Sequence, residues 1–300
     1  MNAESNPQKS FRVGYAAIVG KPNVGKSTLM NRLLRQKLAI VSPKPQTTRH
    51  RILGILNGRD HQVIFLDTPG LMHPKYRLQK NMVKTAQKTM KEADLILMMV
   101  EATGVGTNDE NVVHMLNTLK AQKFLLVNKV DLVQKNRLLP LIENFQEMAL
   151  FQEIVPISAL RSDGLDLLLS LILKYLPEGE PFYPPDMVSD EPERFFVSEI
   201  IREQIFIHYG EEIPYSAAVQ IETFEEKPEH KDYIRAIVNV ERDSQKGIII
   251  GKGGQTLKKV GIRARENIEQ FLGRPVFLEL DVRVKKNWRK NDSLIKRMGY

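Results

Sequence analysis

The sequence contains no cysteine, has a single tryptophan and lacks any long apolar run. Without cysteine, the 300-residue chain can form neither disulfides nor thiolate metal sites. No apolar run approaches the roughly 18 to 20 residues that span a bilayer, and no basic-then-apolar leader opens the chain. These absences exclude disulfide-stapled, thiolate-metal and transmembrane proteins, and we expect a soluble, cytoplasmic protein that is a monomer.

The most informative segment is 20–27, which matches the phosphate-binding pattern G-x-x-x-x-G-K-[ST] without a mismatch. The apolar run 16–19 predicts a strand before it, and 27–34 predicts a helix after it. Loop amides and the positive end of the helix then converge on one point, which suits a polyphosphate. Lys26 would reach the terminal phosphates. The expected nucleotide contacts in this loop are Gly20, Lys21, Pro22, Asn23, Val24, Gly25, Lys26, Ser27 and Thr28.

A second motif identifies the base. Asn128, Lys129 and Asp131 follow the predicted strand 124–127, and ligands of open parallel sheets bind beyond such strand ends. The Asp131 carboxylate can accept from both the ring N–H and the exocyclic amine of guanine, whereas adenine offers no such pair of donors. The nucleotide is therefore predicted to be GTP, with GDP as the product.

Three further segments lie where a GTP-binding domain needs them. Asp67, Thr68, Pro69 and Gly70 end the predicted strand 63–66, so that Asp67 would hold magnesium through water and Gly70 would sense the γ-phosphate. Ser158, Ala159 and Leu160 follow the predicted strand 154–157, and an amide near Ala159 would contact the guanine oxygen. The polar segment 45–49 would order around magnesium through a threonine hydroxyl, and we favour Thr48 over Thr47. The predicted magnesium ligands are Ser27, Thr48 and Asp67.

The second half of the chain is divided by charge. A stretch with five prolines, 177–192, predicts an extended linker. The overall net charge of +8 is unevenly spread. Residues 181–241 carry 5 Lys or Arg against 14 Asp or Glu, whereas residues 242–300 carry 15 Lys or Arg against 6 Asp or Glu. A basic block of this kind is typical of a surface that meets a phosphate backbone.

A glycine loop inside the basic block indicates which nucleic acid is bound. The G-x-x-G turn 251–254 lies between predicted helices, as in KH domains, where it clamps about four nucleotides of single strand. The predicted order α-β-β-α-α-β is similar to the type II KH topology. The expected RNA contacts are Gly251, Lys252, Gly253 and Gly254, with Lys246 and Lys258 adding charge. Trp288 could stack on a base, but core packing is at least as probable for one aromatic.

The chain resembles the Era-like bacterial GTPases, in the branch that carries a C-terminal KH domain. The motifs that carry this resemblance are the run 20–27, Gln46 to His50, Asp67 to Gly70 and Asn128 to Asp131. The resemblance covers nearly the whole chain. It implies that the second domain binds the 3′ end of the small-subunit ribosomal RNA, and that the protein assists maturation of the 30S subunit.

The expected fold is an α/β P-loop GTPase domain with a mostly parallel six-stranded sheet and helices on both faces, followed by an α+β type II KH domain. We expect a flexible N-terminus at 1–10, a GTP-binding domain at 11–178, a proline-rich linker at 179–192 and a KH domain with a basic tail at 193–300.

The sequence also lacks a residue that many GTPases use. Leu71 stands where a glutamine often orients the attacking water, so intrinsic turnover is predicted to be slow. His73 is nearby, but a loop histidine beside proline is more often a turn residue. In related GTPases an asparagine at the position of Asn23 accompanies a potassium ion, and Asn23 is therefore a candidate potassium ligand. The expected catalytic residues are Lys26, Thr48, Gly70 and Asn23.

Two rival interpretations remain open at this point. The basic surface could meet anionic lipid in a signalling GTPase that is peripheral at the cytoplasmic side of the membrane, for which the segment 75–91 would be the cationic helix. Alternatively, the protein could be chiefly an RNA-binding module whose GTPase site acts as a stability element.

Overall fold

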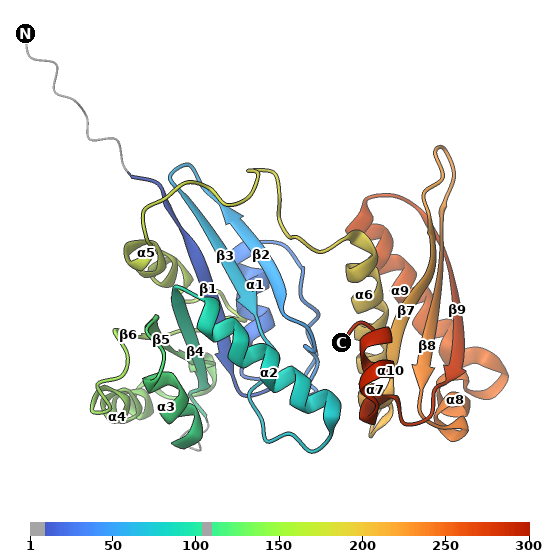
Figure 1. Cartoon of the computed structure of the whole chain (residues 1–300), viewed down its shortest axis with the longest axis horizontal. Helices are drawn as coiled ribbons and strands as arrows, with labels where there is room; N and C mark the ends of the chain where they lie inside the picture. The colour runs from blue at the N-terminus through green and yellow to red at the C-terminus, as the bar shows by residue number, and fades with distance from the viewer. Residues whose placement is uncertain (1–9, 104–109) are drawn as a thin grey trace, which may run out of the picture. The chain divides into compact units, whose positions relative to one another are not determined.

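The computed structural model describes residues 10–103 and 110–300, and these form two compact units (Figure 1). The first unit runs up to Lys37 and adds Arg51–Leu71 and Thr85–Asp190, while the second comprises Leu38–His50, Met72–Lys84 and Glu191–Tyr300. The flexible N-terminus predicted for 1–10 lies outside the described residues except for its last position.

The first unit is built on a six-stranded sheet in the order β2-β3-β1-β4-β5-β6. All neighbouring strands are parallel except the pair β2 and β3, which is antiparallel. The central strands are buried along almost their whole length, as strands covered on both faces must be. The strands are β1 (Arg12–Gly20), β2 (Ile52–Asn57), β3 (His61–Asp67), β4 (Leu95–Glu101), β5 (Gln122–Asn128) and β6 (Glu153–Pro156).

Helices cover both faces of this sheet, with α2 in front and α1 behind in the view of Figure 1. Apolar residues of α2 and α4 pack against β1, β4 and β5 in one continuous core that also includes Leu71. The helices are α1 (Lys26–Leu34), α2 (Arg77–Glu92), α3 (Glu110–Asn117), α4 (Lys135–Gln146) and α5 (Leu165–Tyr175), with a 3-10 turn η1 (Val130–Leu132). The predicted α/β architecture is confirmed.

The second unit contains a three-stranded sheet in the order β7-β8-β9, in which β7 and β8 are antiparallel and β8 and β9 parallel. Helices α6 and α9 pack on it over an apolar core. The elements are α6 (Glu193–His208), α7 (Ile213–Ser216), β7 (Ala218–Glu225), β8 (Asp232–Val240), α8 (Asp243–Ile250), η2 (Lys252–Gly254), α9 (Gln255–Leu272), β9 (Val276–Val284), η3 (Trp288–Lys290) and α10 (Asp292–Arg297). Apart from the added α7, η2, η3 and α10, the order is the predicted one.

The proline-rich segment is held against the first unit. The amide of Ile55 donates to the Val188 carbonyl at 2.9 Å, and the Ser189 hydroxyl donates to the Leu53 carbonyl at 2.6 Å. These bonds occupy the free edge of β2, which lies at the end of the sheet. The linker limits 179–192 stay a prediction.

Two segments that precede the KH region in sequence, 38–50 and 72–84, belong to the second unit. Leu78 and Met82 of α2 share an apolar cluster with Trp288, Ile295 and Met298. Trp288 is fully buried, and its ring nitrogen donates to the Ser216 carbonyl at 2.8 Å. The indole is therefore a core residue, because a buried ring with a satisfied N–H has no free face for a base.

Candidate functional site

The phosphate loop turns between β1 and α1 in a conformation that requires glycine. Gly25 has φ 104°, and a Cβ there would lie 2.3 Å from the Asn128 amide nitrogen. A Cβ on Gly70 would lie 2.6 Å from the Pro22 nitrogen, so the segment after β3 also approaches the loop closely. The predicted segments 20–27 and 67–70 are thus brought together through backbone contact that side chains would block.

Lys26 lies inside this loop and is only 6% exposed. Its ammonium donates to the Lys21 carbonyl at 2.9 Å and to the Gly20 carbonyl at 3.3 Å. Burial lowers the pKa of Lys26 to about 8, and the Asp67 carboxylate opposes that shift. A buried cation at the centre of a ring of backbone groups is suited to a polyanion, which would restore its usual pKa.

Ser27 and Asp67 meet at one point of the first unit. The Ser27 hydroxyl donates to a carboxylate oxygen of the buried Asp67 at 2.6 Å. Both groups offer only oxygen, the ligand atom that magnesium prefers. The pair therefore fits a magnesium site. Thr48, the third predicted ligand, is buried in the second unit.

Asn128 holds two loops together from the end of β5. Its side-chain nitrogen donates to the Val24 carbonyl at 2.7 Å, and its side-chain oxygen accepts from the Ala159 amide at 2.9 Å. Because Asn128 is 2% exposed, its amide has no competing water. The side chain links the phosphate loop to the loop after β6, and a guanine oxygen would have to share the Ala159 amide.

Asp131 follows Asn128 on the turn η1 and is restrained by two neighbours. The Ser158 hydroxyl donates to one carboxylate oxygen at 2.7 Å, and the Arg161 guanidinium lies 3.6 Å from the other. The Ser158 hydrogen bond holds the pKa of Asp131 below its usual value. An ionised, oriented carboxylate at this edge of the sheet can accept from two donors of a guanine ring.

The remaining predicted nucleotide contacts have mixed environments. The Thr68 hydroxyl is buried and donates to the Ile18 carbonyl at 2.9 Å, and Lys129 pairs with Glu101. Leu71 is 7% exposed and belongs to the core, whereas Leu160 is 67% exposed. Since the Leu71 side chain is apolar and packed inside, it has no means to orient water. Direct contact of these residues with nucleotide stays a prediction.

The G-x-x-G loop of the second unit joins α8 to α9. Gly251, Gly253 and Gly254 all have positive φ, and no atom lies within 4 Å of a Cβ placed on Gly253 or Gly254. Gly254 opens onto a groove of about 350 Å³ between α9 and β9. The loop backbone is therefore exposed to a ligand, and only glycine takes this conformation readily.

The groove contains residues that the sequence analysis missed. Lys258, one of the expected RNA contacts, lines it, whereas Lys246 lies on α8 and is not among the lining residues. The missed residues are apolar positions and one arginine spaced along α9 and alternating along β9, a pattern that marked them only as core or surface. They are Leu257, Gly261, Ile262, Arg265, Leu278 and Leu280.

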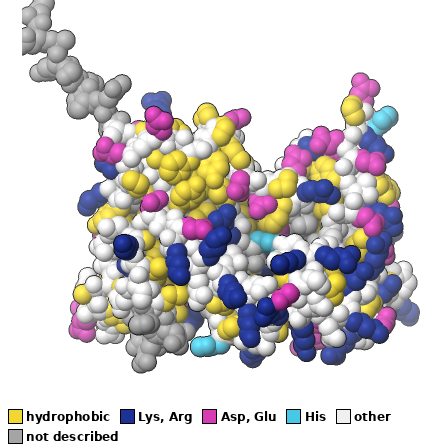
Figure 2. Space-filling model, viewed as in Figure 1, with side chains coloured by type: hydrophobic (Ala, Val, Ile, Leu, Met, Phe, Trp, Pro, Cys, Tyr) yellow, Lys and Arg dark blue, Asp and Glu magenta, His cyan; other side chains and the backbone are white. Residues whose placement is uncertain are grey.

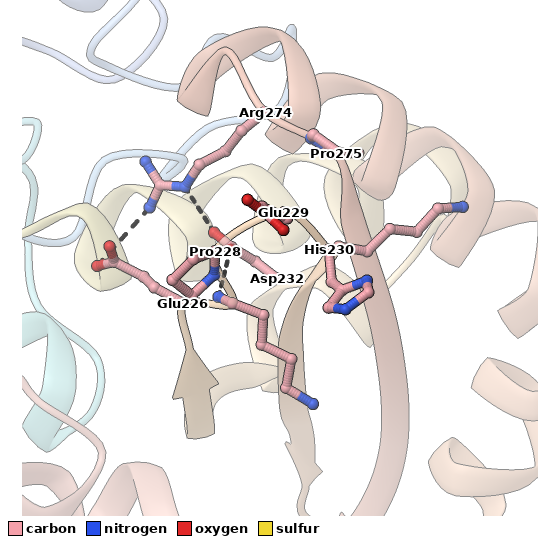
Figure 3. Close-up of a pocket in the computed structure, with 9 residues that line it drawn as sticks. Glu226, Pro228, Glu229, His230, Asp232, Arg274 and Pro275 are labelled. Atoms are coloured by element: carbon pink, nitrogen blue, oxygen red, sulfur yellow. Dashed lines mark hydrogen bonds and ion pairs between the residues drawn. The ribbon is translucent and has the colours of Figure 1, made fainter.

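A larger hollow of about 640 Å³ lies at the hairpin between β7 and β8 (Figure 3). Arg274 points toward two carboxylates there, with Asp232 at 2.5 Å and Glu226 at 3.8 Å, and it also binds Glu193 at 2.6 Å. Three carboxylates neutralise this guanidinium. We therefore assign no phosphate to this hollow.

Comparison with known families agrees with this geometry. A family described as 50S ribosome-binding GTPase matches residues 15–129, and the KH domain family matches 212–289. The chain is 48% identical to GTPase Era of Staphylococcus haemolyticus, with 96% of each chain covered. It is 47% identical to GTPase Era of Geotalea uraniireducens, covering 98% of this chain and 99% of the relative. No described helix combines the length and hydropathy that a bilayer span requires.

Two solved Era structures superpose on the chain with a TM-score of 0.93, at 45% identity and with 97% of this chain and 99% of theirs covered. One is a single-residue variant from Aquifex aeolicus bound to GDP and aluminium fluoride. The other is a complex with MgGDPNP and nucleotides 1506–1542 of 16S ribosomal RNA. From its sequence relatives, its two domains and this fold, the chain belongs to the Era family of GTPases, which hydrolyse GTP to GDP and phosphate.

Proposed function

We propose that this GTPase binds single-stranded ribosomal RNA in the groove between α9 and β9, at the 3′ end of the small-subunit RNA, and assists maturation of the 30S subunit. The open glycine loop, which contains Lys252, lies beside a groove lined by Lys258 and Arg265, and this arrangement carries the proposal. The solved Era complex that contains nucleotides 1506–1542 of 16S ribosomal RNA supports it.

Replacing Gly253 by aspartate is expected to weaken RNA binding at least about tenfold, because it adds a like charge and strains a positive φ at the backbone contact. Binding is measured with a labelled oligonucleotide copied from the 3′ end of 16S RNA. A matched control is Gly299→Asp, which changes another exposed glycine of positive φ away from the groove. Equal affinity of Gly253→Asp and wild-type protein would refute the proposed site.

The nucleotide site is proposed to divide its work among three groups. Lys26 and the amides of the loop 20–27 would hold the phosphates, Asp131 would bind the guanine, and Ser27 with Asp67 would hold magnesium. Magnesium supplies positive charge on the phosphate oxygens. We propose Thr48 as a further ligand and the Gly70 amide as the contact to the γ-phosphate.

Asn23 is proposed to bind potassium beside the phosphates. It is exposed at the tip of the phosphate loop with φ 66°, a left-handed conformation that asparagine tolerates. A monovalent cation there would add the charge that other GTPases obtain from an arginine, and Leu71 leaves the site without a glutamine.

Turnover of GTP is therefore expected to be about tenfold faster in potassium than in sodium chloride at equal ionic strength, a modest share of what an added charge supplies. The ratio should fall to about one in Asn23→Ala. Asn31→Ala, on α1 beyond the loop, is the control and should keep the difference. Identical rates of the wild-type protein in the two salts would eliminate the potassium hypothesis.

We further propose that the segments 38–50 and 72–84 couple the nucleotide bound in the first unit, GTP or GDP, to the conformation of the KH domain. Both segments pack in the second unit, where Lys44 donates to the carbonyls of Phe206 and Tyr209 and Val41 donates to Glu203. Ordering of Thr48 by GTP would then alter the contacts of α6. Crosslinking to total RNA with and without a nonhydrolysable GTP analogue tests this coupling, and the same RNA yield in both samples would contradict it.

No observation favours the rival membrane function. A lipid-binding helix needs an accessible apolar face. In α2 that face is buried, since Leu78, Met82, Ala86 and Met90 are each at most 2% exposed. A cytoplasmic location and a monomeric state stay as proposals from the sequence.

A further inference from the structure

Lys129 differs from the other lysines of the surface. Dark blue side chains of Lys and Arg stand out over much of the surface in Figure 2, whereas the Lys129 side chain is only 31% exposed. Its backbone has φ 66°, a left-handed conformation that is unfavourable for a residue with a Cβ. Such a conformation persists where the surrounding structure holds it, so the contacts of this lysine are informative.

The ammonium group of Lys129 is held by Glu101, with which it forms an ion pair. Glu101 is the last residue of β4, and the register of the two parallel strands places it opposite Asn128, the last residue of β5. The Thr103 hydroxyl donates to the second carboxylate oxygen of Glu101 at 3.4 Å. Because both partners are only about 30% exposed, water screens this pair less than a fully exposed one, and the pair restrains both side chains.

Lys129 lies between two residues that organise the nucleotide site. Asn128, directly before it, donates to the Val24 carbonyl of the phosphate loop at 2.7 Å. Asp131, two positions after it, is the proposed acceptor for guanine. The Lys129 carbonyl accepts from the Leu132 amide at 3.0 Å, so the turn that carries Asp131 is closed on Lys129. The backbone of this lysine is therefore fixed at the edge of the sheet where ligands of open parallel sheets bind.

The order of the strands determines what the Lys129 side chain covers. Strand β4 lies between β1, which leads into the phosphate loop, and β5, which leads to Asp131. A nucleotide with its phosphates at the loop and its base at Asp131 therefore has to cross the end of β4. The ion pair with Glu101 holds the four-carbon stem of Lys129 over the same interval, from the end of β5 to the end of β4. Such a stem packs its methylene groups against apolar surface, for example the face of a purine ring.

We propose that Glu101 is a positioning residue for nucleotide binding: it holds the Lys129 stem across the ends of β4 and β5, as one side of the nucleotide site, and thereby slows dissociation of GTP and GDP. Glu101 acts through Lys129 and takes no part in the chemistry of hydrolysis. The inference rests on the proposed binding of guanine by Asp131. It deepens that proposal, since Asp131 selects the base whereas Glu101 determines how long the nucleotide stays bound.

Glu101→Gln is expected to release nucleotide about fivefold to tenfold faster, because a neutral amide no longer holds the ammonium group. Dissociation is followed by stopped-flow fluorescence of GDP and of a nonhydrolysable GTP analogue, each carrying a methylanthraniloyl label. Both nucleotides should be affected to the same extent, and the preference for guanine over xanthine should stay. The rate at which bound GTP is hydrolysed in a single turnover should stay within about twofold, since only binding is altered.

A second comparison separates positioning from a purely structural role. Lys129→Met keeps an unbranched apolar stem but has no ammonium group for Glu101 to hold. If Glu101 acts through Lys129, adding Glu101→Gln to Lys129→Met should change the dissociation rate by less than about twofold. Glu101→Asp, which keeps the charge on a shorter side chain, should restore part of the slow release. The matched control is Glu153→Gln, since this half-buried acid begins β6, at the amino end of the parallel strands, and the change should leave dissociation unaltered.

Two results would overturn the inference while leaving the guanine site in place. One is unchanged dissociation of nucleotide from Glu101→Gln. The other is an equal acceleration by Glu101→Gln in the wild-type protein and in Lys129→Met, which would mean that Glu101 supports the fold of the site rather than the lysine. If Asp131→Asn also leaves nucleotide binding unaltered, the proposed guanine site itself fails.

Discussion

Replacing Asp131 by asparagine is expected to weaken GTP binding by about 3 kcal/mol, or roughly 100-fold, and to create binding of xanthosine triphosphate. The carboxylate of Asp131 is kept ionised and oriented by Ser158, so it can accept from both guanine donors. An asparagine amide can accept only one and places its own N–H against the other. Xanthine carries an oxygen in place of the guanine amine, and the amide can donate to it.

Calorimetric titration of each protein with GTP and with xanthosine triphosphate measures this change of nucleotide preference. Asp166→Asn, an equal change of charge at an exposed position in the first turn of α5, is the matched control and should keep the preference for GTP. Unaltered GTP affinity in Asp131→Asn would show that the carboxylate does not contact the base, and the reading of this motif would have to be abandoned.

The second large effect is expected at Arg49, which lies in the motif segments 45–49 and 46–50 but to which the sequence assigned no role of its own. Arg49 is 5% exposed, and its guanidinium donates to three carbonyls around α7: Ala217 at 2.8 Å, Pro214 at 2.9 Å and Tyr215 at 3.1 Å. Aromatic rings of Phe206, Trp288 and Tyr300 surround it at 5.4 to 5.9 Å. Arg49 thereby fastens the segment that contains Thr48 to the KH domain.

Arg49→Ala is expected to lower the free energy of unfolding of the second unit by about 3 kcal/mol or more, because it removes the guanidinium from three carbonyls, two of them in fully buried hydrogen bonds. Arg49→Lys should fall between alanine and wild type, since one ammonium cannot reach all three carbonyls. Urea denaturation followed by fluorescence of Trp288, the single tryptophan, reports this unit directly.

Arg51→Ala is the control for Arg49, since Arg51 lies two residues further on, its side chain is 39% exposed and its guanidinium lies 3.5 Å from Glu92. It should change stability by less than about 0.5 kcal/mol. If Arg49→Ala were as stable as Arg51→Ala, the segment 38–50 would not be held by these contacts, and the proposed route from nucleotide to KH domain would lose its support.

Local sequence was sufficient to predict the strands and helices that carry the motifs. The strands before residues 20, 67 and 128 and the helices around the loop 251–254 occur where hydrophobic periodicity places them. Each motif is contiguous and lies at the end of such an element, so its backbone geometry follows from a few neighbouring residues. This is why Asp131, Lys26 and the glycine loop could be named as candidates before any fold was known.

Other features depend on contacts between residues that are distant in the sequence, and hydrophobic periodicity does not predict such contacts. Asn128 links loops 104 and 31 residues away, and Arg49 bonds to Ala217 across 168 positions. The burial of Trp288 and the groove-lining residues of β9 likewise follow from packing between elements. Such contacts form only when the chain is folded, since nothing local distinguishes a buried arginine or tryptophan from an exposed one.

The sequence by itself therefore determined the family and predicted the chemistry of the sites: a phosphate loop, a carboxylate expected to bind guanine and a glycine turn expected to bind RNA, each encoded within a few consecutive residues. The tertiary structure alone decided how these parts are supported. It placed the segments 38–50 and 72–84 in the same compact unit as the KH domain, and it paired Arg77 of α2 with Asp292 of α10. These features depend on long-range packing, because the burial of a side chain and its distance from other charges are properties of the folded chain and not of the local sequence.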